Sequence, residues 1–326
     1  MKIKLGISIG DSNGIGIEII LKTFKDNRIL EFCTPIIFGS NDIFSQHKKV
    51  LQIHNFNFNI IRDISKLKHN KVNLLEVLKS NNKVHFGEAN DSSGYNAINS
   101  IDAAIDACKK NKIDALVTAP INKSSIQKNK SDFIGHTEYL KNSFNGDSLM
   151  IMISEVMKIA CLTGHTSLSN VKNYISKENI IKNLLIFNNS LKNDFGKIKP
   201  KIAVLALNPH AGENGMLGSE ETEIIIPAIN DLKERGLLVF GPYSADSFFT
   251  NKNSTMSVCQ FVSKKKLIVI CYGPTYGAPF SRLVSYCLLC YNFLLEYSFL
   301  TRNTLFRDIN YSWFLLCWEV RTPGFC

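Results

Sequence analysis

The sequence predicts an α/β fold in which helices cover both faces of a parallel sheet. Short apolar runs alternate with segments of helical periodicity along most of the chain, and glycine, asparagine or proline separates them. Parallel strands need long crossover connections, which helices usually supply, so this alternation favours a parallel sheet. The length of 326 residues exceeds one average domain, so we expect one or two α/β domains.

The first part of the chain opens with a strand, a loop and a helix. Residues 4–10 form a predicted strand that ends in glycine, and residues 15–26 show helical spacing, with Glu18 in the first turn favouring the helix dipole. The elements predicted next are a buried strand at 33–40, a helix at 41–51 begun by an Asn or Asp cap, an amphipathic helix at 97–114, and a buried strand within 115–123.

The alternation continues through the middle of the chain. Two short apolar runs joined by a turn lie in 148–168. The elements that follow are a helix at 179–195, a strand within 200–212, a helix at 222–236 closed by glycine, and a strand within 237–249. In open α/β sheets ligands bind beyond the carboxyl ends of the strands, so we expect the functional residues in these connecting loops.

Composition excludes several classes of protein. Lys and Arg outnumber Asp and Glu by 38 to 28, which favours acidic or phosphorylated partners, but no basic stripe studded with aromatic residues indicates nucleic-acid binding. The first apolar run is broken at Gly10, before a signal peptide could form, and the first 258 residues carry only Cys33, Cys108 and Cys161. We therefore expect a cytoplasmic protein with reduced thiols.

The character of the chain changes after about Lys266. Six of the nine cysteines and both tryptophans lie between Cys259 and Cys326, and the alternation of helix and strand fades. Residues 282–302 are long enough to cross a bilayer, but Asn292 and Glu296 in the middle make insertion costly, so no membrane association is expected. This composition is typical of a wrong reading frame or of a foreign end joined to an enzyme.

Three of the seven histidines share one local pattern. His136, His165 and His210 each follow glycine or proline near a strand or turn, whereas the others occupy polar or helical segments that suggest surface or core-edge roles. A lone histidine is more often structural, but three in matching contexts favour a common cleft for a metal ion or an anionic substrate. Catalytic zinc commonly uses three protein ligands and leaves a position for water or substrate.

The glycine-rich stretch 9–18 is a weak nucleotide signal. A turn between strand and helix can present backbone N–H groups to phosphate, but this one lacks the third glycine of the dinucleotide fingerprint and the lysine of a P-loop. A tight turn that serves only helix packing is an equally good interpretation.

Six motifs, taken in order, make the chain similar to the 4-hydroxythreonine-4-phosphate dehydrogenase family of vitamin B6 synthesis. The similarity covers roughly Met1 to Asn253 with family-like spacing, which is far more specific than any single glycine turn. The motifs lie at 9–18, 115–123, 135–140, 162–165, 207–221 and 241–249.

The resemblance implies two α/β/α domains with a central cleft, related to the isocitrate and isopropylmalate dehydrogenases, and a homodimer. It implies a first domain over 1–134 that the C-terminal part normally completes, a second over 135–258, and a non-matching tail over 259–326. NAD or NADP is the implied cofactor, with no residues assigned to it. The implied reaction is oxidation and metal-assisted decarboxylation of 4-phosphooxy-L-threonine (4-hydroxythreonine 4-phosphate).

The resemblance also implies roles for single residues. His165 and His210 match two of the three metal-ligand histidines, for a divalent cation such as zinc, magnesium or cobalt. His136 and Thr137 match the substrate-binding pair. Two residues are expected to act in catalysis: Asp246 lies in the segment that lines the site in relatives, and Lys123 adds positive charge near the cleft.

The chain departs from the family pattern after residue 253. The third metal histidine should follow 241–249, yet no histidine occurs beyond His210. Metal affinity and activity should be impaired, because each lost ligand removes a coordinate bond. Two alternatives stay open: a non-catalytic protein that binds a phosphorylated ligand, and a dehydrogenase of another phosphorylated hydroxy acid.

Overall fold

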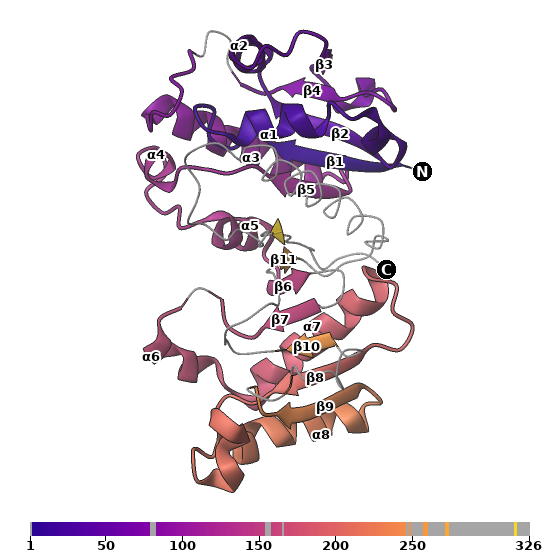
Figure 1. The fold of residues 1–326 in the computed structure, drawn as a ribbon, viewed down its shortest axis with the longest axis vertical. Helices are drawn as coiled ribbons and strands as arrows, with labels where there is room; N and C mark the ends of the chain where they lie inside the picture. The colour runs from indigo at the N-terminus through magenta and orange to yellow at the C-terminus, as the bar shows by residue number, and fades with distance from the viewer. Residues whose placement is uncertain are drawn as a thin grey trace. The chain divides into compact units, whose positions relative to one another are not determined.

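The computed structural model describes residues 2–78, 83–153, 158–164, 166–245 and 248, and the backbone of three short strands farther along the chain. Contacts divide the chain into two compact units, with the division after Phe144 (Figure 1). The predicted limit at residue 134 lies just before helix α5 (His136–Phe144), which groups with the first unit.

The first unit contains a five-stranded sheet of order β3-β4-β2-β1-β5. All of its strand pairs run parallel, as the sequence predicts. Its elements before α5 are β1 (Ile3–Ser8), α1 (Gly16–Thr23), η1 (Asn27–Glu31), β2 (Cys33–Gly39), α2 (Asn41–Val50), β3 (Asn59–Ile61), η2 (Ile64–Lys66), β4 (Asn73–Glu76), α3 (Asp91–Lys109), β5 (Ala115–Thr118) and α4 (Lys123–Gln127).

The loops after β1 and β5 lie side by side. The Asp11 backbone N–H donates to the Pro120 carbonyl oxygen at 2.9 Å. Gly10 has φ +67°, and a Cβ there would lie 2.2 Å from the same oxygen, so a side chain cannot fit. The glycine of the first loop is thus needed for the close approach of two strand ends.

Helices α3, α4 and α5 are joined by a small apolar cluster. Ala97 and Ile98 of α3 pack against Ile126 of α4 and against Phe133, just before α5. Helix α3 also approaches α4 closely, since a Cβ on Gly94 would lie 2.0 Å from the Ser125 carbonyl oxygen. This packing fixes the starts of α4 and α5, where three predicted site residues lie.

The second unit contains a sheet of order β12-β11-β6-β7-β10-β8-β9. Its elements are β6 (Leu149–Ile153), β7 (Lys158–Cys161), α6 (Leu168–Val171), η3 (Lys172–Tyr174), α7 (Lys177–Asn193), β8 (Lys201–Leu205), η4 (Pro209–Gly215), the π-helical η5 (Glu221–Ile225), α8 (Ile226–Glu234), β9 (Leu238–Tyr243), β10 (Ser257–Cys259), β11 (Cys271–Gly273) and β12 (Leu316–Cys317).

This second sheet is mixed, which corrects the expectation of purely parallel sheets. Strand β6 runs antiparallel to β7 and to β11, while the other pairs are parallel. The reason is the connection between Ile153 and Lys158, which is too short for the crossover that a parallel pair requires.

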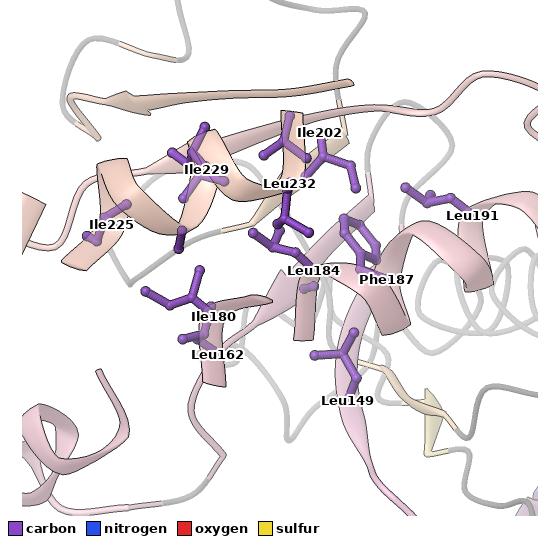
Figure 2. Packing of buried hydrophobic residues seen from close by; sticks show 14 of the residues in the cluster. Leu149, Leu162, Ile180, Leu184, Phe187, Leu191, Ile202, Ile225, Ile229 and Leu232 are labelled. Atoms are coloured by element: carbon purple, nitrogen blue, oxygen red, sulfur yellow. The ribbon is translucent and has the colours of Figure 1, made fainter. Parts of the chain in front are cut away.

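Helices α7 and α8 cover the second sheet with one continuous core. Figure 2 shows Leu184 and Phe187 of α7 directed toward Leu232 of α8. The helical spacing of the apolar residues in 179–195 therefore corresponds to the buried face of α7. The buried members of this core are Leu149, Ile151, Ala160, Leu162, Ile175, Ile180, Leu184, Phe187, Leu191, Ile202, Val204, Ile225, Ala228, Ile229, Leu232 and Val239.

Three cysteines in the described part of the chain form no disulfide. Cys33 is buried, and burial raises the pKa of Cys108 and of Cys161 to about 11. Their thiols are therefore protonated near neutral pH, as expected of unreactive structural residues. Among the described helices, none combines the length and the apolar character that crossing a bilayer requires.

Candidate functional site

The first group of candidate residues lies at the starts of α4 and α5, in the first unit. We call Lys123, Gly135, His136, Thr137 and Glu138 the α4–α5 site. Lys123 is the first residue of α4, and the two predicted substrate-binding residues open α5. The sequence predicted a strand within 115–123, but that strand ends at Thr118, and Lys123 and His136 each begin a helix.

A glycine allows the lysine to lie against the start of α5. Gly135 is buried, and a Cβ built on it would lie 3.5 Å from Lys123 Nζ and 3.3 Å from Glu138 Oε2. The ammonium and carboxylate groups therefore flank the backbone just before His136. Asn122 stabilises the start of α4, because its side-chain oxygen accepts a hydrogen bond from the Ser125 N–H at 3.1 Å.

Burial and charge keep the His136 ring neutral. Desolvation lowers the pKa of His136 to about 4, and the positive charge of Lys123 acts in the same direction. Its Nε2 atom is buried without a hydrogen-bond partner among the described residues, although the residue as a whole is partly exposed. Thr137 beside it is buried.

The α4–α5 site is suited to an anionic ligand. It offers one ammonium group, one neutral imidazole with an unpartnered ring nitrogen, and the N-terminus of a nine-residue helix. The first N–H groups of a helix lack intrahelical partners, and the helix dipole favours negative charge there. A phosphate or carboxylate group could satisfy both the helix and the imidazole.

The second group of candidate residues surrounds His210 in the second unit. Residues 209–215, here called the 209–215 turn, follow β8 after a short link. His210, Ala211, Gly212, Glu213 and Asn214 all have left-handed backbone angles, with φ between 42° and 76°. The His210 side chain is exposed.

A buried glutamate holds the entrance to this turn. Glu221, which is only 2% exposed, accepts hydrogen bonds on Oε1 from the backbone N–H groups of Leu207 at 2.8 Å and of Asn208 at 2.7 Å. Its Oε2 accepts from Asn208 Nδ2 at 2.9 Å. Asn208 Nδ2 also donates to Glu220 Oε2 at 2.8 Å, and this bond is the main cause that lowers the Glu220 pKa.

The predicted residues fall partly inside and partly outside the described chain. Lys123, His136 and Thr137 lie together at the α4–α5 site, whereas His210 lies in the other unit. His165 and Asp246 lie outside the described residues. Within those described, no group of three or more His, Cys, Asp or Glu side chains could hold a metal ion, so the donor chemistry of His210 fits a cation but a ligand set is not assembled.

The sequence did not reveal the residues that support these sites. Glu221 lies 14 and 13 positions from the two backbone groups it binds, and no spacing rule links them. The available signal was weak, since two acidic residues at the start of a helix are common. His47 was expected at the surface or core edge, but it is buried, and its Nε2 lies 2.8 Å from the Ser12 carbonyl oxygen in the loop after β1.

Comparison with known proteins gives a consistent set of relatives. The family model described as pyridoxal phosphate biosynthetic protein PdxA matches residues 31–265. A 4-hydroxythreonine-4-phosphate dehydrogenase from Bacteroides thetaiotaomicron is 43% identical over 256 residues, which are 78% of this chain and 70% of the relative. A candidate D-threonate 4-phosphate dehydrogenase from Fusobacterium nucleatum is 32% identical over 76% of this chain and 75% of that protein.

A solved structure supports the same grouping. The crystal structure of 4-hydroxythreonine-4-phosphate dehydrogenase from Klebsiella pneumoniae matches with a TM-score of 0.70 and 26% sequence identity. The match covers 79% of this chain and 81% of that chain.

Proposed function

The chain belongs to the 4-hydroxythreonine-4-phosphate dehydrogenase (PdxA) family of oxidoreductases, and from this membership we propose its substrate, its cofactors and the roles of its residues. The proposed reaction is oxidation of 4-phosphooxy-L-threonine by NAD or NADP, followed by loss of CO₂. The proposal depends on one observation: at the α4–α5 site a neutral imidazole, whose Nε2 has no hydrogen-bond partner among the described residues, lies beside Lys123 at a helix N-terminus.

Each residue of the α4–α5 site has a distinct part in this proposal. The first turn of α5, with His136 and Thr137, binds the phosphorylated substrate, and Lys123 contributes the balancing positive charge. A neutral His136 can donate to or accept from the substrate without adding charge, according to its tautomer. Lys123 further disfavours protonation of the ring, so the two groups keep one positive charge rather than two.

The remaining roles concern cofactors. When bound, NAD(P)⁺ would accept the hydride from the carbon that bears the secondary hydroxyl, and a divalent cation would stabilise negative charge on the oxygen formed there. His210 and His165 are the residues proposed to hold that cation, and Asp246 is proposed to act in catalysis. A homodimer and a cleft between two domains complete the proposal, and both stay predictions.

Two alternatives remain in competition with this function. Relatives 32% identical over about three quarters of the chain are named for D-threonate 4-phosphate, so a related phosphorylated hydroxy acid is the second candidate substrate. A non-catalytic protein that binds a phosphorylated ligand is the other. The absence of histidine after His210 in the sequence favours lowered dehydrogenase activity with either substrate and is consistent with the binding protein.

One assay separates these functions. The purified chain is given NAD or NADP, a divalent metal, and either 4-phosphooxy-L-threonine or D-threonate 4-phosphate, and reduced cofactor is followed. We expect higher kcat/KM with 4-phosphooxy-L-threonine and no reaction with the unphosphorylated acids. Calorimetric binding of both phosphorylated compounds without cofactor reduction would instead establish the binding protein.

Substitution of Lys123 tests the charge proposed for the α4–α5 site. Lys123→Ala should raise the KM or Kd for the phosphorylated substrate by about tenfold, because one charge-assisted contact of about 1.5 kcal/mol is lost. Lys141→Ala is the matched control, since Lys141 is exposed on α5 and its substitution removes the same charge. Equal effects of the two substitutions would assign the result to overall charge rather than to the site.

A further inference from the structure

We propose that Glu221 is the positioning residue of the 209–215 turn: its buried carboxylate fixes the conformation that presents His210. The inference rests on the proposed function, in which His210 holds a cation, but Glu221 itself contacts neither substrate nor metal in the proposal. It acts through the backbone on which His210 is carried.

The hydrogen bonds show how the carboxylate takes the place of a strand partner. Leu207 and Asn208 follow the end of β8, and their backbone N–H groups bind Glu221 Oε1 rather than a neighbouring strand. The Asn208 side chain closes a third bond to the other carboxylate oxygen. Three donors therefore meet one buried acceptor group, which offsets its desolvation.

The turn needs such support because its backbone is unfavourable. A left-handed conformation is unfavourable for a residue with a Cβ, and four of the five left-handed residues in the turn have one. Two carbonyls of the turn bind residues beyond it: the Leu217 N–H donates to the Gly212 carbonyl oxygen at 3.0 Å, and the Met216 N–H donates to the Glu213 carbonyl oxygen at 3.2 Å. The conformation persists only where its surroundings determine it.

Gly212 brings the carboxylate and the turn into direct contact. Gly212 is buried with φ +76°, and a Cβ there would lie 2.8 Å from Glu221 Oε2. The carboxylate thus lies directly against Gly212, at a place where a side chain would not fit. Of the donors on Leu207 and Asn208, Glu220 binds only the Asn208 side chain. Glu220 therefore assists Glu221 in holding the turn but does not replace it.

The experiment measures the turn and the metal site separately in the full chain. Amide hydrogen exchange at Leu207 and Asn208 reports the turn, calorimetry with Zn²⁺ alone reports the cation site, and the urea midpoint reports global stability. We compare Glu221→Ala, Glu221→Gln and His210→Ala. Glu223→Ala is the matched control, since Glu223 is an exposed acid of the same η5 segment.

Glu221→Ala should accelerate exchange of both amides at least a hundredfold and weaken Zn²⁺ binding at least tenfold, because three donors lose their acceptor. Glu221→Gln keeps one carbonyl oxygen for the two backbone N–H groups, so exchange should rise only three- to tenfold at an almost unchanged urea midpoint. His210→Ala should weaken Zn²⁺ binding without changing exchange, and Glu223→Ala should change neither quantity.

The outcomes distinguish this inference from the proposed function. A folded Glu221→Gln or Glu221→Ala protein with the parent's exchange rates and Zn²⁺ affinity overturns the positioning role. Equal damage by Ala and Gln, spread over all amides, overturns it too, since that pattern means general destabilisation. If instead His210→Ala binds Zn²⁺ as the parent does, the metal role of His210 is wrong, and the exchange data still decide whether Glu221 holds the turn.

Discussion

Burial keeps the His136 imidazole neutral at physiological pH. The pKa of about 4 arises first from desolvation and second from Lys123, and the ring nitrogen Nε2 has no partner among the residues that the structure describes. An unpartnered buried nitrogen costs stability in the free protein. A ligand that bonds to it would recover that cost, and this supports the proposal that His136 contacts the substrate.

This buried histidine should make stability depend on pH. The unfolded chain binds the proton at a pKa near 6.5 and the folded chain only near 4, so the contribution of the neutral ring is complete above pH 6.5 and is lost as pH falls toward 4. In His136→Gln, the loss of unfolding free energy between pH 7 and 4.5 should be smaller by roughly 1–3 kcal/mol.

Urea unfolding at the two pH values measures this difference. His54→Gln is the control, because His54 is an exposed histidine of the same unit. Identical pH profiles for the parent and His136→Gln would show that the ring titrates normally in the folded protein.

Desolvation also acts at the end of helix α7, where it raises the pKa of an acid instead of lowering that of a base. The C-cap of this helix is Asp194, a residue that is only 2% exposed. Desolvation raises the pKa of Asp194 to about 6, against the lowering effect of a 2.7 Å hydrogen bond from Ser190 Oγ, and its Oδ1 is buried without a partner among the described groups. At neutral pH this helix therefore ends at an ionised carboxylate in an unfavourable environment.

Asp194→Asn should stabilise the protein at neutral pH. The folded carboxyl binds its proton more tightly than the unfolded one, so its contribution is most favourable below about pH 4 and falls as pH rises to 6. The substitution should raise the free energy of unfolding by about 1–2 kcal/mol at pH 7 and leave it unchanged near pH 4. Exposed Asp132→Asn serves as control, and a loss of stability at pH 7 would contradict the prediction.

The elements that the sequence revealed are those with strong periodicity. Helix α7 and strands β1 and β2 lie where apolar spacing placed them, because their burial follows directly from the pattern. The sequence did not predict that β6 and β7 are antiparallel, because a short apolar run does not show the relative direction of two strands. Capping was misassigned too: α2 is capped by Ser40 rather than by Asn41 or Asp42.

The candidate site was predictable only in its most recognisable residues. The motif resemblance identified the family correctly and selected His136, Thr137, Lys123 and His210. Gly135 was not predicted because its role depends on the absence of a Cβ. Glu221 was not predicted because it contacts residues far away in the sequence, which apolar periodicity does not reveal. The roles of His165 and Asp246 stay predictions, as do those of the described residues.

The whole chain combines a family-like majority with an atypical last part. The family model matches residues 31–265, and the sequence beyond His210 contains no histidine. Replacing residues 254–326 by the corresponding segment of the Bacteroides thetaiotaomicron relative should therefore raise kcat/KM for 4-phosphooxy-L-threonine by at least tenfold. The reason is the third imidazole that the family resemblance implies for that segment, which would complete the proposed metal site.

Steady-state assays of the parent and the hybrid measure this gain. A hybrid that also carries His210→Ala should lose it, which ties the effect to the metal site rather than to improved folding. Parent activity equal to that of the hybrid would mean that the present C-terminal part is sufficient. Reading the gene in its neighbouring frames from about codon 253 then tests whether a frameshift produced this part.

The left-handed 209–215 turn has a consequence for protein chemistry. Five successive residues adopt the left-handed helical conformation, which is favourable for D-amino acids and unfavourable for L-amino acids with a Cβ. A semisynthetic chain with D-alanine in place of Ala211 should melt at a higher temperature than the natural enantiomer. At this turn the chirality of the L-residues opposes the backbone conformation that they adopt.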